Sequence, residues 1–148
     1  MDEALCQLVR AWLIKASNDL DTARQISALP DGHLDTAIYH CQQAAEKALK
    51  GFLAYHDHEL ERTHDLKLLV QSAATDEPSF HGWMDAASLL TPYAVAYRYP
   101  GESALLEPGR AEFDEALRTA GEFVQFILSL LPQDVKPGAK NGKKQEPE

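Results

Sequence analysis

The stretch Tyr39–Phe52, YHCQQAAEKALKGF, decides the fold of this 148-residue chain. Its apolar residues recur at three- and four-residue spacing, which places their side chains on one face of an α-helix. With their neighbours they form an apolar stripe of Ile38, Cys41, Ala44, Ala45, Ala48, Leu49, Phe52 and Leu53. Because alanine is small, another helix can approach this stripe closely. We therefore predict a packed helix here, with the Cys41 thiol in the core.

Helical periodicity also extends on both sides of this stretch. We expect helices over residues 4–28, 34–56 and 110–131, a shorter one capped by Thr63, and one from Ser79 that Pro92 kinks or splits. No segment alternates apolar and polar residues with the period of a strand. The sequence therefore predicts an all-α fold, an up-and-down antiparallel helical bundle of four main helices plus a shorter helix.

Length and composition favour one domain. The helical bundle would span residues 1–132, and the Pro-, Gly- and Lys-rich residues 133–148 would form a disordered tail because they have almost nothing to bury. Two cysteines without a CxxC pair suit a reducing cytosol. The acidic residues after Met1 do not resemble an export signal, and the apolar run 123–131 is too short to span a bilayer. We expect a cytoplasmic protein without a membrane partner.

The charge is concentrated in the bundle. The chain carries a net charge of −9, and the tail from Asp134 onward has four lysines against three acidic residues, so the rest has −10. Phosphate binding releases counterions only where cations gather, and an acidic body is therefore a poor non-specific binder of nucleic acid. A small basic pocket remains compatible with this charge.

The polar side of the 34–56 helix supplies the first candidate site. His40, Gln43, Lys47 and Lys50 are three or four residues apart and share one strip of the helix. One interpretation is a solvated surface on which Glu46 and Lys50 pair. The other is an anion-facing strip in which the two lysines meet phosphate and His40 donates a hydrogen bond.

Residues 62–65, RTHD, form a second candidate. Thr63 and Asp65 are suited to begin a helix, and His64 then packs locally. Alternatively, Arg62 and His64 stand beside the free amides of a helix N-terminus, which is a ready anion site.

Two further segments carry reactive side chains. Residues 97–101, YRYPG, either fix a loop or make an interface, or Arg98 and Tyr99 form a stacking and phosphate-pairing surface for a nucleotide. Residues 56–59, HDHE, contain four potential ligands, but adjacent residues rarely converge on one ion. We interpret this segment as an exposed polar loop and expect neither a metal nor a cofactor.

Taken together and in order, these pieces resemble the HEPN family, small α-helical domains. The resemblance covers about residues 12–131. It rests on HCQQAAEKALKGFL at 40–53, THDL at 63–66, RYPG at 98–101, and Trp12, Lys15, Ala16, Asp19 and Leu20 in the first helix. It implies a helical bundle that is commonly a homodimer and is linked to nucleotides or RNA. It also implies a minimal nucleotidyltransferase as partner in a toxin–antitoxin-like module.

The chain departs from the ribonuclease members of this family, which carry an Arg followed four to six residues later by His. After Arg98 those positions hold Glu102, Ser103 and Ala104. A metal-independent ribonuclease needs a base and a cation placed together, and His64 with Arg62 or Arg98 is the remaining combination.

We therefore predict a nucleotide- or RNA-linked binding module rather than an enzyme. Its site is expected to include His40, Lys47, Lys50, Arg62, His64, Arg98 and Tyr99. The alternatives are a ribonuclease toxin with an altered motif and a purely structural interaction module.

Overall fold

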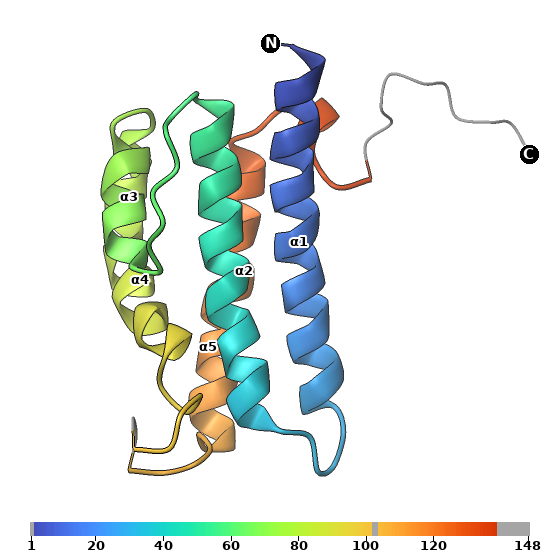
Figure 1. The fold of residues 1–148 in the computed structure, drawn as a ribbon, viewed down its shortest axis with the longest axis vertical. Coiled ribbons are helices and arrows are strands. Elements are labelled where there is room, and N and C mark those ends of the chain that lie inside the picture. Colours follow the sequence, from blue (N-terminus) through green and yellow to red (C-terminus); the bar gives the residue numbers. More distant parts are fainter. Residues whose placement is uncertain (1, 102–103, 139–148) are drawn as a thin grey trace, which may run out of the picture.

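The chain forms a bundle in which three long helices lie side by side (Figure 1). The structure is a computed structural model, and it describes residues 2–101 and 104–138. The long helices are α1 (Glu3–Ser27), α2 (Leu34–Tyr55) and α5 (Arg110–Ser129). The shorter α3 (Leu66–Ala74) and α4 (Met84–Leu90) cover the opposite side of α2 from α1. The predicted all-α class is confirmed, because the described ranges contain helices and no strand.

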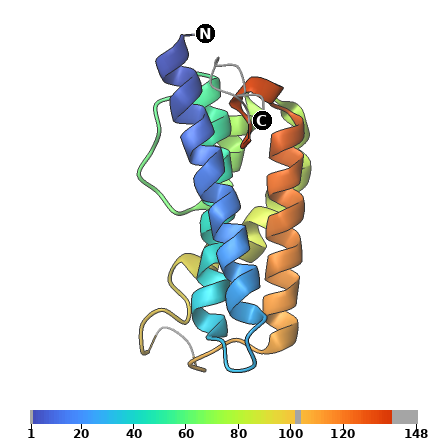
Figure 2. The same ribbon diagram turned by 90° about the vertical axis from the view of Figure 1, so that its right-hand side faces the viewer.

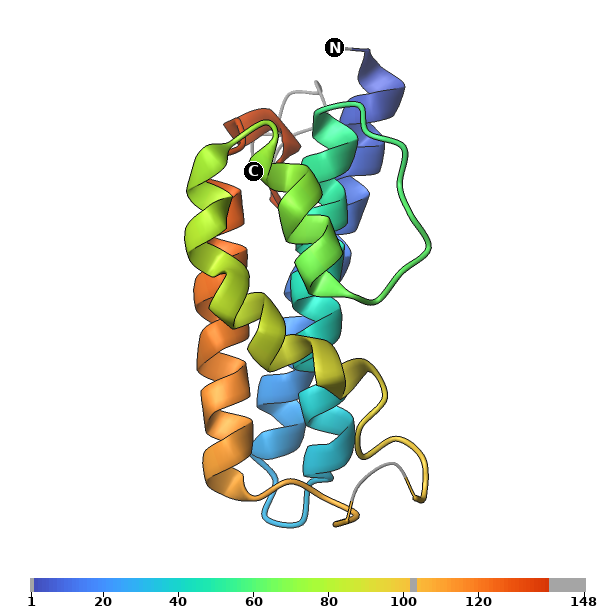
Figure 3. The same cartoon turned by 90° about the vertical axis from the view of Figure 1, so that its left-hand side faces the viewer.

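The order of the helices places α2 at the centre of the bundle. It packs against both α1 and α5, and α3 contacts it as well. Figure 2 shows α1 and α5 extending along the length of the molecule. After α2, residues 56–65 run back along the outside of the bundle, so that α3 points in the same direction as α2 (Figure 3).

The start of α3 differs from the prediction. The N-cap of α3 is Asp65 rather than Thr63, because the Asp65 carboxylate accepts the hydrogen bond from the backbone N–H of Lys67 at 2.9 Å. Thr63 instead accepts from the N–H of Asp65 at 3.0 Å, one step before the helix.

The segment that begins at Pro78 is divided into three pieces: η1 (Pro78–Trp83), α4 and η2 (Thr91–Ala94). Pro92 lies in the first turn of η2, where its missing N–H costs no helical hydrogen bond. The predicted split at this proline is therefore present.

The core is built around aromatic side chains that α2, η1 and α5 contribute. The ring of Phe80 lies 4.9 Å from that of Phe52 and 6.4 Å from that of Phe123, measured between centroids. Trp83 stacks on Phe123 and Phe126 at the edge of this cluster. Fifteen of the 22 residues of α2 are buried, so α2 is packed on nearly all sides and not only along its apolar stripe. Cys41 is fully buried, as predicted, and burial raises the pKa of its thiol to about 12.

The 56–59 segment is not simply a solvated loop. His56 and His58 both lie against the carboxylate of Asp76, which follows the end of α3. Asp57 between them has a positive φ of 64°, which turns the chain out of α2. The two histidines thus fasten the start of the loop to α3.

The packed part of the chain extends beyond the predicted boundary at residue 132. Residues Gln133–Val135 form a short 3₁₀ turn, η3, and Val135 is fully buried. The Arg10 guanidinium on α1 donates to the backbone oxygen of Asp134. Residues 139–148 of the predicted tail lie outside the described residues. No helix within the described ranges is both long and apolar enough to cross a membrane.

A glycine on α2 sets the distance between α1 and α2. A Cβ atom built on Gly51 would lie 3.0 Å from Leu13 Cδ2 and 3.2 Å from Trp12 Cβ, both on α1. The Trp12 Cβ is attached to the helix backbone and cannot move aside without moving α1. The two helices therefore approach so closely at Gly51 that a side chain there would have to push them slightly apart.

We predict that Gly51→Val lowers the free energy of unfolding by about 1–3 kcal/mol, the usual cost of overpacking a core. Gly82→Val is the matched control, because a Cβ at Gly82 meets no atom within 4 Å. Urea unfolding at neutral pH measures both variants. A midpoint for Gly51→Val equal to that of Gly82→Val would contradict the close contact.

Candidate functional site

A carboxylate on α1 holds two of the predicted site residues. Asp19 is only 6% exposed, and its two oxygens lie 2.8 Å from His40 Nδ1 and 2.8 Å from Lys47 Nζ, both on α2. We call these three residues the Asp19 cluster. A buried carboxylate is costly unless charged or hydrogen-bonded groups compensate it. Asp19 therefore orients the His40 ring and serves as the counterion of the Lys47 ammonium.

A second carboxylate, Glu46 on α2, holds two more of the predicted site residues. Glu46 is 5% exposed and accepts from His64 Nδ1 at 2.8 Å and from Lys50 Nζ at 2.9 Å. The side-chain amides of Gln42 and Gln43 also donate to it. We call this set the Glu46 cluster. Burial alone would raise the pKa of Glu46, but the hydrogen bonds from His64 and Lys50 outweigh it and hold the pKa below its ordinary value.

The turn after η2 brings Arg98 onto α2. The Arg98 guanidinium lies 4.2 Å from the ring centre of Tyr39 and 5.3 Å from that of Tyr99. Its Nη1 donates to the backbone oxygen of Ala94 at 3.1 Å. A guanidinium over aromatic rings keeps most of its donors available while its position is fixed.

Tyr97 sets the path of the backbone just before Arg98. Its φ of 69° is in the left-handed region, which is unusual for a bulky residue. Its hydroxyl donates to Glu112 Oε1 at 2.9 Å, and Tyr93 donates to the other oxygen at 2.6 Å. Burial, followed by the hydrogen bond to Glu112, raises the pKa of Tyr93. Two tyrosines on one α5 carboxylate thus fix the segment that carries Arg98.

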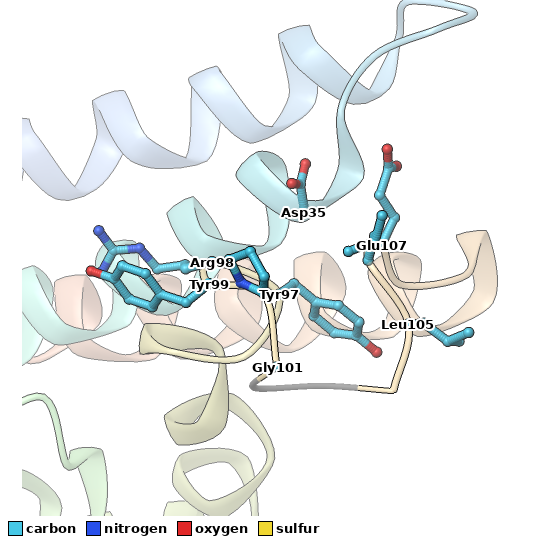
Figure 4. A pocket seen from close by; sticks show the side chains of 9 residues that line it. Asp35, Tyr97, Arg98, Tyr99, Gly101, Leu105 and Glu107 are labelled. Atoms are coloured by element: carbon cyan, nitrogen blue, oxygen red, sulfur yellow. The ribbon is translucent and has the colours of Figure 1, made fainter.

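Two adjoining pockets open near the N-terminal end of α2. The first, which we call the α2 cleft, has a volume of about 280 Å³ and is lined by Asp35, Thr36, Tyr39, His40, Tyr97 and Arg98. The second, the loop pocket, has about 270 Å³ and shares Asp35, Tyr97 and Arg98 with the cleft (Figure 4). Tyr99, Leu105 and Glu107 also form part of its wall. In Figure 4, Arg98 and Tyr99 extend together along α2, away from Glu107.

The structure brings some of the predicted site residues together and separates others. His40 and Arg98 line the same cleft, Tyr99 stands beside Arg98, and Lys47 is joined to His40 through Asp19. Lys50 and His64 belong instead to the Glu46 cluster. Glu46 is seven residues after Tyr39, or about 10 Å along a helix that rises 1.5 Å per residue. The combination of His64 with Arg98, considered above for catalysis, therefore spans two turns of α2.

Arg62 is exposed on the outer loop, and it forms no hydrogen bond or ion pair with any other described residue. The structure does not place it with Arg98 in either pocket.

Sequence reasoning assigned no role to two residues of the site. Asp19 lies three residues after Ala16 and four before Ala23, which are core positions of α1. A single carboxylate inside an apolar stripe is the signal that could have found it, because such a group needs a cationic partner. Tyr39, the platform under Arg98, carries no comparable signal, since its partner comes from a segment about 60 residues away.

The comparisons with known proteins agree with this architecture. The model of the HEPN domain family matches residues 9–130, which is most of the chain. The chain belongs to the HEPN domain family. Among curated proteins, no relative was matched.

Two solved structures resemble this HEPN domain. One is TT1696 from Thermus thermophilus, with 28% sequence identity, a TM-score of 0.70, and coverage of 84% of this chain and 99% of that one. The other is ST0689, described as an archaeal HEPN homologue, with 26% identity, a TM-score of 0.62, and coverage of 82% and 96%. Both likenesses extend over nearly the whole of the solved chain and over more than four-fifths of this one.

The Glu46 cluster leads to a prediction about pH. Because the folded protein holds the pKa of Glu46 below its ordinary value of 4.5, the cluster stabilises the fold fully above that pH. This stability is lost as the pH falls through the lowered pKa. Glu46→Gln should reduce the free energy of unfolding by about 3–5 kcal/mol at pH 7, because it leaves Lys50 without its charge partner.

The difference in unfolding free energy between the wild type and Glu46→Gln should therefore narrow below pH 4.5. Chemical unfolding between about pH 7 and pH 3 measures it. Glu122→Gln is the control, since Glu122 is an exposed partner of Arg118 on α5 and should change stability little at any pH. A difference that stays constant across this whole range would contradict the role given to Glu46.

Proposed function

We propose that this HEPN domain is a binding module for a nucleotide, which it takes up in the α2 cleft. The observation that carries the proposal is the Arg98 guanidinium, which lies over the rings of Tyr39 and Tyr99 in a residue that lines the same cleft as His40. A nucleotide offers both groups that such a surface recognises, a base that stacks and a phosphate that pairs with a fork of N–H donors.

The other cations along α2 support this choice. Lys47 and Lys50 already lie within 2.9 Å of Asp19 and Glu46, so each has a carboxylate as counterion. Arg98 has no carboxylate partner within ion-pair distance among the described residues. In a protein with a net charge of −9, a fixed cation that lines a pocket and has no ion-pair partner among the described residues is a local place for phosphate to bind.

The stacking half of the proposal depends on Tyr99. Its side chain is among the exposed large groups, at 53%, although it is next to the Arg98 guanidinium. A base that stacks on Tyr99 places its phosphate within reach of Arg98 and of His40. The Nδ1 atom of His40 is bonded to Asp19, which leaves Nε2 as the ring atom for a ligand.

We predict that the purified protein binds ATP or AMP in isothermal titration calorimetry and that Arg98→Ala weakens the binding at least about tenfold. The size follows from a charged hydrogen bond, which contributes about 1.5–3 kcal/mol. Arg98→Lys should be intermediate, because lysine keeps the charge and loses the planar fork. Arg118→Ala, an exposed arginine on α5, is the control. If no nucleotide at millimolar concentration gives heat or shifts the melting temperature, the proposal fails.

A second candidate, ribonuclease activity, is favoured by one observation. His40 and Arg98 supply a base and a cation to one pocket, and Asp19 orients the imidazole through Nδ1. In RNA cleavage by this pair, His40 Nε2 would take the proton of a ribose 2′-hydroxyl, and the 2′-oxygen would attack the neighbouring phosphorus while Arg98 stabilises the charge that develops. The bond from phosphorus to the 5′-oxygen of the next nucleotide would break, which leaves a 2′,3′-cyclic phosphate, and the departing 5′-oxygen would take a proton from solvent.

This activity predicts that labelled RNA is cleaved and that an all-DNA strand of the same sequence is not, because DNA lacks the 2′-hydroxyl. His40→Ala should abolish the cleavage, whereas His81→Ala, an exposed histidine on η1, should keep it. RNA that stays intact with the wild-type protein removes this candidate.

The assembly of the module is part of the same proposal. The family resemblance supports a homodimer, a cytoplasmic location and a minimal nucleotidyltransferase partner. Analytical ultracentrifugation gives the oligomeric state. Co-expression with a nucleotidyltransferase encoded beside the gene tests the partnership, and a complex that survives high salt without any nucleotide dependence would favour the purely structural module.

A further inference from the structure

Three potential metal ligands meet at the entrance of the loop pocket. His33 precedes α2, Asp35 lies in its first turn, and Glu107 comes from the loop before α5. One ligand atom of each lies within 4.8 Å of the others. Among residues 2–101 and 104–138, no other group of three or more histidine, cysteine or carboxylate side chains lies as close together. Residues about 70 positions apart in the sequence are thus brought to one point by the fold.

The spacing of these atoms suits a shared ion better than a hydrogen bond. His33 Nδ1 and Glu107 Oε2 are 3.9 Å apart, which is beyond hydrogen-bond distance. Two ligands that each stand about 2.1 Å from a metal are separated by about 3.0 to 4.2 Å, depending on the angle between them. His33 and Glu107 are exposed and Asp35 is half-buried, so rotation of the two exposed side chains can bring the three groups toward one centre.

The donor types narrow the choice of ion. One imidazole nitrogen with two carboxylate oxygens suits first-row divalent cations such as Mn²⁺, whereas Mg²⁺ and Ca²⁺ prefer oxygen ligands alone. The two carboxylates carry two negative charges, whereas the N-terminus of α2 supplies only about half of one positive charge. The remaining negative charge attracts a cation. Three protein ligands leave the remaining coordination positions for water or phosphate.

The location connects this group to the nucleotide. Asp35 lines both the α2 cleft and the loop pocket, and Glu107 lines the loop pocket, in which Arg98 forms part of the wall. Figure 4 shows the Asp35 and Glu107 carboxylates ending on the same side of the pocket. Asp35 is one helical turn from Tyr39, over which Arg98 is held. A ligand that fills both pockets would therefore contact the carboxylates and Arg98, provided that a cation neutralises the carboxylates.

We propose that His33, Asp35 and Glu107 bind one first-row divalent cation, which holds the phosphates of the nucleotide whose other contact is Arg98. The second half of this inference rests on the proposed nucleotide function. The first half does not, because the ion binds to protein ligands alone.

The first experiment uses Mn²⁺ without nucleotide and measures the electron paramagnetic resonance signal of the free ion. The full-length wild-type protein should bind one Mn²⁺ per chain, and His33→Ala and Glu107→Gln should each weaken the binding at least about tenfold. His81→Ala and Asp76→Asn are the controls. His81 is an exposed histidine, and Asp76 belongs to the other pairing of histidines with a carboxylate. Mn²⁺ that stays free with the wild type, or binds His33→Ala equally well, overturns the site.

The second experiment repeats the ATP titration with and without Mn²⁺. Mn²⁺ should tighten ATP binding at least about tenfold in the wild type and not in His33→Ala. Arg98→Ala should keep its affinity for Mn²⁺ and lose affinity for ATP. Equal ATP affinity with and without Mn²⁺ overturns the shared-phosphate half. If Mn²⁺ binds but ATP binds under neither condition, the proposed nucleotide function fails and the metal site stands.

Discussion

The contact of the Asp19 carboxylate with His40 and Lys47 joins α1 to α2, and the geometry of the site depends on it. Both distances are 2.8 Å, and Asp19 is almost completely buried between the helices. Removal of a charge from water is expensive, and it is tolerated only where partners of opposite charge or hydrogen-bond donors replace the water. At the level of Gly51 the same two helices are so close that an added Cβ atom would lie 3.0 Å from the Leu13 side chain. The polar and the apolar contacts together allow one register of α1 on α2.

The Glu46 cluster is a second buried carboxylate with basic partners, and it holds the outer loop on α2 rather than joining α1 to α2. Glu46 gathers donors from its own helix and from His64, which is 18 residues away on the outer loop. The loop is thereby fastened to α2 at its end, as His56 and His58 fasten its beginning to Asp76. Both clusters use the cations of α2 to compensate buried carboxylates. The surface near the pockets consequently depends on Arg98 for its positive charge, although the sequence of α2 suggested a strip of several cations.

How far the sequence could predict this molecule follows from the range of each interaction. The apolar stripe of α2 is a local pattern with helical period, and it predicted the packed helix, the buried Cys41 and the all-α class. The pairing of Glu46 with Lys50 is also local, four residues apart, and is present. The partners of His40, Lys47 and His64 are 18 to 28 residues away, and no periodicity reports on them. The sequence therefore assigned His40 and Lys47 to solvent or to an anion, and His64 to local packing or to an anion site, whereas the fold pairs all three with buried carboxylates.

Contacts with distant parts of the chain, rather than the sequence around it, fix the position of Arg98. Tyr97 holds a left-handed backbone, which costs a non-glycine residue about 1–3 kcal/mol and persists only where surrounding contacts determine it. Those contacts are the hydrogen bond of Tyr97 to Glu112 on α5, the neighbouring bond from Tyr93, and the stacking of Arg98 on Tyr39. A loop that served only to connect η2 with α5 would relax to an unstrained path. Strain held by contacts from two helices is instead expected where one side chain must stay in place, and here that side chain belongs to Arg98, which lines both pockets.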